Sequence, residues 1–456
     1  MTGTSASCPG PITRRELLRV GSFALGGLSL TDLLAAREAR GTGRPDTSVI
    51  LLYLHGGASQ LETYDLKPDA PTTHRSIFKP IRTNVPGMDL CEHLPLHARI
   101  ANKFSLVRSL YHDIPIHSDG GIIVLTGKRP SVLDPTSQSK SEHPDFGSVT
   151  SRMRGPGSGG FPPYVTIPNR MYMVRPTYLG LEHGGFEARD PSIPDYRPAT
   201  LSLAGGTDTR RLDNRRRLLG EVDRYRREND PSGLYETTDR YRSLAFDLLT
   251  SPTVAAAFDL SKEKDSLRDR YGRNIWGQGC LLARRLAEAG AAVTTLYINT
   301  PKNGDEYTNW DDHIMNAGRP GHFGKYMEVR LPYYDQCLSA LIQDLHDRGL
   351  DRKVMVVAVG EFGRTPRLST NSNGVGRDHW PQAYTALIAG GGLKMGQVVG
   401  ATDEKAEHPT DSPYTPQDLL ATVYRHLGVD PTQNFTDSTG RPIPILYEGE
   451  PIRELV

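Results

Sequence analysis

Residues 48–57 read SVILLYLHGG, an apolar run that ends abruptly in a histidine and two glycines. A continuous apolar run, without alternation, is typical of a strand that is buried on both faces in a parallel sheet. The polar end of the run, at His55, predicts a loop at the carboxyl end of that strand, where open α/β sheets bind their ligands. This segment therefore predicts an α/β fold with a site at the edge of its sheet.

Similar apolar runs recur along the chain in alternation with amphipathic segments. Further strands are expected at residues 104–110, 164–167, 292–298, 354–359 and 384–389. Helices are expected at residues 280–289, 331–345 and 416–427, and from Gly120 with Ser118 as N-cap. This alternation predicts a mostly parallel sheet with helices on both faces. Mixed charges around residues 205–275 are interpreted as solvated helices of an insertion.

Composition and charge exclude several classes of protein. The chain has 456 residues, of which 37% are hydrophobic, so it can bury a sizeable core and general disorder is not expected. Its 54 Lys and Arg against 53 Asp and Glu provide no basic field that would hold nucleic acid or an anionic membrane. Four cysteines are too few for a disulfide scaffold, and none of them forms a Cys-x-x-Cys pair.

The first forty residues are predicted to be an export signal. Arg14 and Arg15 precede an apolar run, residues 20–30, that is too short to span a bilayer. A charged segment followed by a short apolar one is the pattern of a signal peptide, and the paired arginines resemble the twin-arginine export signal. An ordinary amphipathic helix is the alternative. Without residues 1–40, residues 41–456 are expected to form one exported domain in the periplasm or at the cell surface, with no transmembrane segment.

Four polar clusters follow the predicted strands or begin predicted helices. They contain His55; His117 and Ser118; Asp311, Asp312 and His313; and Glu361, Arg364, Asp378 and His379. Imidazole and carboxylate together are the ligands of zinc, manganese or iron sites. A hydroxyl at a helix N-terminus is placed to attack phosphorus or sulfur.

Each cluster by itself has a plain structural alternative. His55 alone is a packed histidine, Ser118 alone is a helix N-cap, and Asp312 is a solvated neighbour of its cluster. Glu361 and Arg364 could form a structural ion pair. Since all four clusters fall where one site of an open sheet is expected, their joint placement favours a shared metal or anion site.

The motifs that carry a resemblance are HGGAS at 55–59, WDDH at 310–313, EFGRTP at 361–366 and GRDHW at 376–380. With the twin-arginine start, they resemble an exported bacterial family known as domain of unknown function number 1501, over nearly the whole chain. That family is similar to the alkaline phosphatase and sulfatase superfamily. The resemblance implies that superfamily's α/β fold and a site for a divalent metal (zinc, manganese or calcium). It also implies hydrolysis or transfer of phosphate or sulfate esters.

Site residues follow from this resemblance by position. It makes Asp311, His313 and His379 ligands of one metal and Glu361 a ligand of a second, with Asp378 and His55 as further metal candidates.

The run LTGKRP at 125–130 resembles LTGRYP of sulfatases, and counting back from it puts His117 where sulfatases keep a modified cysteine. Ser118, beside it, is then the candidate nucleophile. His117 or Asp378 would carry the proton, and Arg364 or Lys128 would hold the anionic oxygens.

Departures from the superfamily pattern fall on the metal ligands. Phe362 replaces a histidine of the second metal site, and His55 stands where an aspartate follows the first strand. The prediction is an exported metal-dependent hydrolase of small-molecule or polysaccharide anionic esters. The alternative is a non-catalytic exported binding protein that keeps the fold. A serine esterase is a third and weaker option, because the sequence has no Gly-x-Ser-x-Gly elbow.

Overall fold

The structure is a computed structural model, and it describes residues 46–157, 160–198, 251–301, 309–316, 319–320 and 322–456. Contacts divide the chain into two compact units, Met1–Asp46 and Thr47–Val456. The predicted export signal and residues 205–250 of the predicted insertion lie outside the described residues. Within the ranges that are described, no helix has the length and apolar character of a membrane span.

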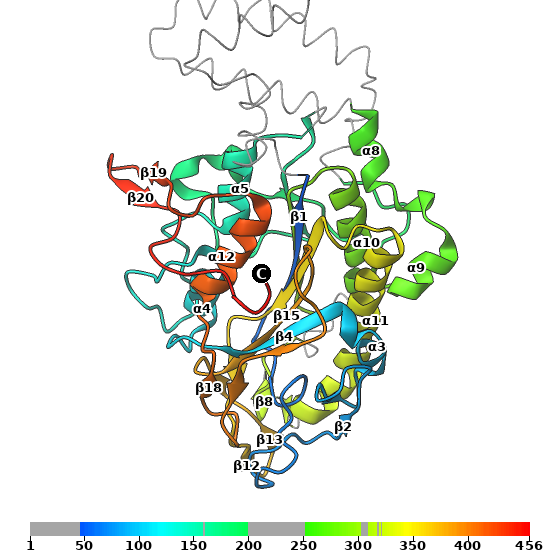
Figure 1. Cartoon of the computed structure of the whole chain (residues 1–456), viewed down its shortest axis with the longest axis vertical. Coiled ribbons are helices and arrows are strands. Elements are labelled where there is room, and N and C mark those ends of the chain that lie inside the picture. The colour runs from blue at the N-terminus through cyan, green and yellow to red at the C-terminus, as the bar shows by residue number, and fades with distance from the viewer. Residues whose placement is uncertain (1–45, 158–159, 199–250, 302–308, 317–318, 321) are drawn as a thin grey trace, which may run out of the picture. The chain divides into compact units, whose positions relative to one another are not determined.

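An eight-stranded sheet lies at the centre of the second unit (Figure 1). The strand order is β16-β4-β15-β10-β1-β7-β5-β6, and within this sheet only β15 runs antiparallel to its neighbours. The strands span Ser48–Leu54 (β1), Phe104–Leu110 (β4), Tyr164–Ile167 (β5), Phe186–Glu187 (β6), Val293–Ile298 (β7), Val354–Val359 (β10), Tyr384–Gly390 (β15) and Val398–Val399 (β16). The predicted mostly parallel sheet is confirmed.

Strand β1 is buried along its whole length, which explains its continuous apolar run. It pairs in parallel with β10 on one side and with β7 on the other. Because successive side chains of a strand point to opposite faces, the strand contributes to two cores. One core takes Ile50, Leu52 and Leu54, and the other takes Val49, Leu51 and Tyr53.

Helices cover both faces of the sheet, as predicted. One core includes side chains of α10 (Ile275–Glu288) and α11 (His322–Asp347). The other includes side chains of α4 (His117–Thr126), α5 (Phe146–Arg154) and α12 (Pro416–Leu427). Figure 1 shows α4, α5 and α12 on one side of the strands and α10 and α11 on the other.

Shorter elements complete the described part of the chain. The remaining α-helices are α3 (Pro95–Arg99), α8 (Pro252–Phe258) and α9 (Asp265–Tyr271). The remaining strands form two-stranded ribbons: β2 (Pro80–Ile81) with β3 (Leu90–Cys91), β8 (Met315–Asn316) with β9 (Arg319–Pro320), β11 (Gly363–Arg364) with β14 (His379–Trp380), β12 (Ser369–Asn371) with β13 (Gly374–Gly376), β17 (Ala401–Thr402) with β18 (Pro409–Asp411), and β19 (Asn434–Thr436) with β20 (Pro442–Pro444).

Helix starts are where the sequence-based prediction was least accurate. Helix α4 begins at His117 after Ile116 as N-cap, so the prediction of Ser118 as the N-cap was wrong. Helix α10 begins at Ile275 and α11 at His322, both earlier than expected. Proline is favoured in the first turn of a helix, yet Pro332 lies inside α11. Helix α12 begins at Pro416 as predicted, and Thr415 caps it in a capping box with Asp418.

Candidate metal centre

Four nitrogen-bearing side chains surround one carboxylate oxygen, Oδ1 of Asp311. The Nε2 atoms of His117, His313 and His379 lie 3.3, 2.9 and 3.2 Å from this oxygen. Arg364 donates to the same oxygen from Nη2 at 2.7 Å. A carboxylate oxygen offers about two lone pairs, so it cannot accept from four donors at once. Since Arg364 always donates, at most one of the three imidazoles can also donate to this oxygen, and at least two Nε2 atoms face it with a lone pair.

The second nitrogen of each ring fixes where its hydrogen lies. The Nδ1 atoms lie close to an acceptor oxygen in all three rings: 2.6 Å from Glu361 Oε1 for His117, 2.8 Å from Asp378 Oδ1 for His313, and 2.8 Å from the Pro115 carbonyl for His379. Carbonyls and ionised carboxylates only accept hydrogen bonds, so each Nδ1 carries the hydrogen. In the neutral rings each Nε2 then presents a lone pair, and this is how metal-binding histidines are held.

These residues fit a divalent cation. His117, Asp311 and His379 each offer one ligand atom, and the three atoms lie within 4.8 Å of one another. Nε2 of His313 lies 3.1 Å from Nε2 of His379, a separation at which two lone pairs repel unless a proton or a cation lies between them. Imidazole nitrogen with one carboxylate oxygen is a ligand set typical of zinc.

The charges of the cluster keep its carboxylates ionised. Burial would raise the pKa of Asp311, but Arg364 and the histidines hold it well below its usual range. Burial also opposes ionisation of Glu361, but His55 and His117 lower its pKa to about 2. Burial would lower the pKa of His117, but its bonds to Asp311 and Glu361 raise it to about 9. A cation at Nε2 of His117 would therefore replace a proton.

The loop after β7 supplies two of the ligand candidates, Asp311 and His313. Tight turns shape this loop, since the Asp312 amide donates to the Trp310 carbonyl at 3.1 Å and the His313 amide donates to the Asp311 carbonyl at 3.0 Å. Trp310 and Asp312 are completely buried, whereas Asp311 and His313 are 24% and 27% exposed. Alternate residues thus point into the core and toward the cluster.

Two glycines let neighbouring loops pack against this segment. A Cβ at Gly56, where φ is +112°, would lie 2.4 Å from the Asp311 amide nitrogen. A Cβ at Gly376 would lie 2.4 Å from the His313 carbonyl carbon. Only glycine permits such close backbone approach, so both positions serve to bring the ligand loop against its neighbours.

Arg364 lies under the cluster and does not face solvent. It is completely buried, and it donates from Nε to the Gly57 carbonyl at 3.0 Å and from Nη2 to the Trp310 carbonyl at 3.1 Å, to the Gly56 carbonyl and to Asp311. A guanidinium that is engaged in this way ties the loops together. The predicted role of Arg364 in holding the anionic oxygens of a substrate is not supported by this placement.

The structure brings together most of the predicted site residues. Besides those already described, Asp378 bonds to His313, and the His55 ring lies 5.7 Å from the His117 ring, centroid to centroid. Glu361 accepts from the Gly56 amide at 2.8 Å and from His117, so it orients a ligand candidate. His117, predicted as a proton carrier, has both ring nitrogens committed to the cluster.

Two predicted residues are engaged elsewhere. Ser118 is completely buried, and its hydroxyl donates to Asp119 Oδ2 at 2.8 Å. Lys128 donates to the Pro444 carbonyl at 2.7 Å and lies 3.7 Å from the centre of the Tyr447 ring. Neither the nucleophilic role of Ser118 nor the substrate-holding role of Lys128 is supported by these contacts.

The positions of three side chains at or beside the cluster were not predicted from the sequence: those of Asp312, Tyr297 and Tyr172. Asp312, interpreted as a solvated neighbour, is completely buried and paired with Arg330. The Tyr297 ring lies 5.0 Å from that of His55, and Tyr172 lies 5.8 Å from it. The sequence did offer a signal for Tyr297, because it is the last residue but one of the predicted strand 292–298, as Tyr53 is of the strand 48–54, and the structure pairs the two.

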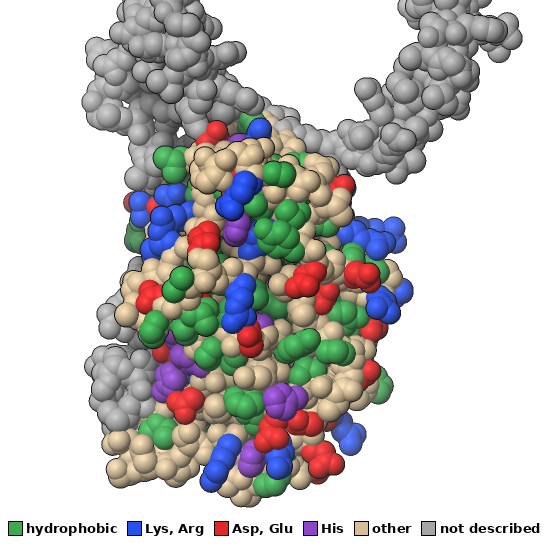
Figure 2. Space-filling view, turned by 90° about the vertical axis from the view of Figure 1, so that its left-hand side faces the viewer, with side chains coloured by type: hydrophobic (Ala, Val, Ile, Leu, Met, Phe, Trp, Pro, Cys, Tyr) green, Lys and Arg blue, Asp and Glu red, His purple; other side chains and the backbone are tan. Residues whose placement is uncertain are grey.

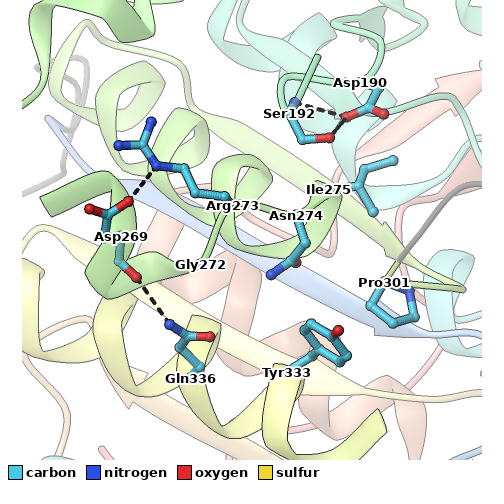
Figure 3. A pocket seen from close by; sticks show the side chains of 10 residues that line it. All are labelled: Asp190, Ser192, Asp269, Gly272, Arg273, Asn274, Ile275, Pro301, Tyr333 and Gln336. Atoms are coloured by element: carbon cyan, nitrogen blue, oxygen red, sulfur yellow. Dashed lines mark hydrogen bonds and ion pairs between the residues drawn. The ribbon is translucent and has the colours of Figure 1, made fainter. Parts of the chain in front are cut away.

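A separate pocket of about 440 Å³ lies among α9, α10 and α11 (Figure 3). Its polar groups mostly bond to one another: Arg273 donates to Asp269 at 2.5 Å, and Gln336 donates to the Asp269 carbonyl at 3.0 Å. Asn274 caps the start of α10. None of the ligand candidates lines this pocket, so it is distinct from the cluster.

One face of the molecule, shown in Figure 2, is mixed in charge. On the face that Figure 2 shows, Lys and Arg side chains are interspersed with Asp and Glu. This mixture of signs agrees with the formal net charge of +1.

Comparison with known proteins gives a family match. The family model described as "Protein of unknown function (DUF1501)" matches residues 46–456. No curated protein matches the chain.

The solved structures that are similar to this chain include three at low identity. A sulfatase from Pseudoalteromonas sp. is 12% identical with a TM-score of 0.36, over 88% of this chain and 70% of that chain. A lipoteichoic acid synthase from Listeria monocytogenes is 12% identical with a TM-score of 0.36, over 92% and 81%. A phosphonate monoester hydrolase from Silicibacter pomeroyi is 11% identical with a TM-score of 0.35, over 89% and 76%. These similarities are too distant to assign a site or an activity.

Proposed function

The chain belongs to the family described as "Protein of unknown function (DUF1501)", and we propose from its candidate metal centre that it is a metal-dependent hydrolase of phosphate or sulfate esters. The predicted export signal would place the reaction in the periplasm or at the cell surface. The substrate class is a small-molecule or polysaccharide anionic ester.

One observation carries the proposal: three imidazole Nε2 atoms converge on Oδ1 of Asp311 while their Nδ1 atoms bond to acceptors. Such a set is costly to assemble without a proton or a cation at its centre, because converging lone pairs repel one another. The four side chains are 17–27% exposed, so a ligand can reach the centre from solvent. A site with an open side is typical of catalytic metal ions.

The chain's own residues prepare this centre for an anion. A bound divalent cation would supply Lewis acidity and neutralise charge that develops on the ester. Helix α4 begins at His117, so the positive end of its dipole lies at the cluster and favours a negative group there. Glu361 and Asp378 hold the hydrogens of His117 and His313 on Nδ1, which keeps the two Nε2 atoms available.

Water is the nucleophile that we propose for this reaction. The burial of Ser118 and the bond of its hydroxyl to Asp119 argue against Ser118 as the attacking group. No covalent intermediate on Ser118 is then expected. In a single displacement the water oxygen would bond to phosphorus or sulfur as the bond to the ester oxygen breaks, and the alcohol would leave with a proton that the water gives up.

The test is metal analysis of the purified protein followed by assays on an aryl phosphate and an aryl sulfate with added zinc or manganese. We expect bound metal and turnover of at least one ester, and loss of both in His379→Ala. The matched control is His346→Ala, since His346 also lies near a carboxylate, Asp351, at 3.9 Å. Metal-free protein that turns over neither ester with either ion would overturn the proposal.

A second function, a non-catalytic exported binding protein, is favoured by one observation. The Phe362 ring lies 4.4 Å from the ring of His379, centroid to centroid. Phe362 occupies the position at which the superfamily pattern has a histidine of the second metal site. Bound metal without turnover of either ester would favour this second function, because the centre would then hold an ion without using it chemically.

A further inference from the structure

Arg330, on α11, is completely buried against the loop that carries two of the ligand candidates. Its guanidinium donates to the Asp312 carboxylate and to the Asn309 carbonyl. Its Cζ atom lies 4.4 Å from the centre of the Trp310 ring. One side chain therefore contacts three of the five residues from 309 to 313.

Asp312 stands between Asp311 and His313, and it points away from them into the core. Its side chain is completely buried, and its carbonyl accepts from the Arg377 amide at 3.1 Å. Asp312 is joined to Asp311 and to His313 by peptide bonds, and the tight turns tie the Asp312 amide to the Trp310 carbonyl and the His313 amide to the Asp311 carbonyl. A shift of Asp312 would therefore move both ligand candidates together.

We infer that the buried Asp312–Arg330 pair positions the metal centre by fixing the directions of Asp311 and His313. This inference rests on the proposed function. Both side chains are completely buried, and a buried ion pair is often no more stabilising than an apolar pair of similar volume. The pair contacts the loop that carries Asp311 and His313, so we assign it a role in positioning them. Groups that do not bind a metal themselves commonly orient the residues that do.

The test uses a double variant, because each single variant leaves one buried charge without its partner and is expected to destabilise the fold. In Asp312→Leu with Arg330→Met both charges are removed, so the fold is expected to persist, as thermal unfolding of the metal-free protein will show. The probes are the metal ions alone: Zn²⁺ affinity by competition with a chromophoric chelator, and the visible absorption of the Co²⁺-loaded protein.

We expect the double variant to bind Zn²⁺ about 10- to 100-fold more weakly than the unchanged protein, and the Co²⁺ absorption band to shift in position and intensity. The control is Arg284→Met, because Arg284 is also buried and ion-paired, and its partners Glu263 and Asp344 lie outside the cluster. We expect this control to lose stability and yet to keep the affinity and the Co²⁺ spectrum.

The outcomes separate the inference from the proposed function. Unchanged Zn²⁺ affinity and an unchanged Co²⁺ spectrum in the double variant overturn the inference while the metal centre stands. Equal weakening in Arg284→Met also overturns it, since loss of stability alone would then explain the effect. An unchanged protein that binds neither ion overturns the metal centre and the inference with it.

Discussion

The cluster around Asp311 and the ion network around Arg284 are both dense in charge, yet they match their charges differently. Arg284 is 1% exposed, and its three guanidinium nitrogens lie 2.8, 2.5 and 3.0 Å from carboxylates of Glu263, Glu288 and Asp344. Each of these nitrogens faces a different carboxylate, and Arg285 and Arg348 contact the same three carboxylates, so cations and carboxylates are matched in number. At the other cluster, three imidazoles and one guanidinium share a single oxygen of Asp311.

This difference separates a structural network from a ligand site. A network that serves stability pairs each charge within the protein, because a buried charge without a partner is costly. At Asp311 each of the three imidazoles is oriented by a hydrogen bond from its Nδ1 atom to an acceptor outside the centre. Their Nε2 atoms converge on the Asp311 oxygen. The number of charged groups does not distinguish the structural network from the candidate metal site. The number of nitrogen atoms that point at the same oxygen does.

The largest expected effect on stability is at the Arg284 network. In Arg284→Met, three carboxylates lose one cationic partner but keep their contacts with Arg285 and Arg348, so the free energy of unfolding should fall by about 3 kcal/mol, the lower end of the range for a broken buried ion pair. Urea unfolding of the metal-free protein measures this. Zn²⁺ affinity should stay at the level of the unchanged protein. A fall in affinity parallel to the loss of stability would contradict the separation of the two clusters.

The largest expected effect on metal binding is at His379. His379→Ala removes one converging lone pair, and Zn²⁺ affinity should fall by more than about 100-fold, beyond the range seen when only an orienting group is lost. Chelator competition measures this, with His346→Ala as the control. The metal-free variant should be about as stable as the unchanged protein, because relief of crowding at Asp311 offsets the lost packing. If His379→Ala kept its Zn²⁺ affinity, the imidazole nitrogens would meet at Asp311 for a reason other than metal binding.

Removal of the metal should also distinguish the two clusters, through a smaller change in the free energy of unfolding. Zn²⁺ at 100 times its dissociation constant should raise the free energy of unfolding by about 2.7 kcal/mol, because it binds only the folded state. This increment should persist in Arg284→Met and disappear in His379→Ala. Thermal unfolding with and without a chelator gives the measurement. An increment of the same size in both variants would mean that the ion binds elsewhere.

The smallest expected effect is at Ser118. Ser118→Ala removes one buried hydrogen bond, to Asp119, worth about 1 kcal/mol. Metal affinity and turnover of the aryl esters should stay close to those of the unchanged protein, as steady-state assays will show. Complete loss of turnover with metal still bound would restore Ser118 as the nucleophile.

The sequence by itself determined the sheet and the edge that carries the cluster. The apolar run of β1 shows burial on both faces, because alternate side chains of one strand must enter two different cores. Carboxyl ends of parallel strands meet at one edge, so the polar segments after β1, β7 and β10 could be expected together. The family motifs likewise pointed to the family that residues 46–456 match.

Only the tertiary structure decided which of these polar side chains meet. Asp312 stands between two ligand candidates in the sequence but turns into the core, Arg364 is completely buried and bonds to Asp311, and Lys128 bonds to the Pro444 carbonyl. Periodicity and propensity are local, so they define elements and their faces. The direction of a single side chain depends on partners far along the chain, such as the Pro115 carbonyl that fixes the ring of His379.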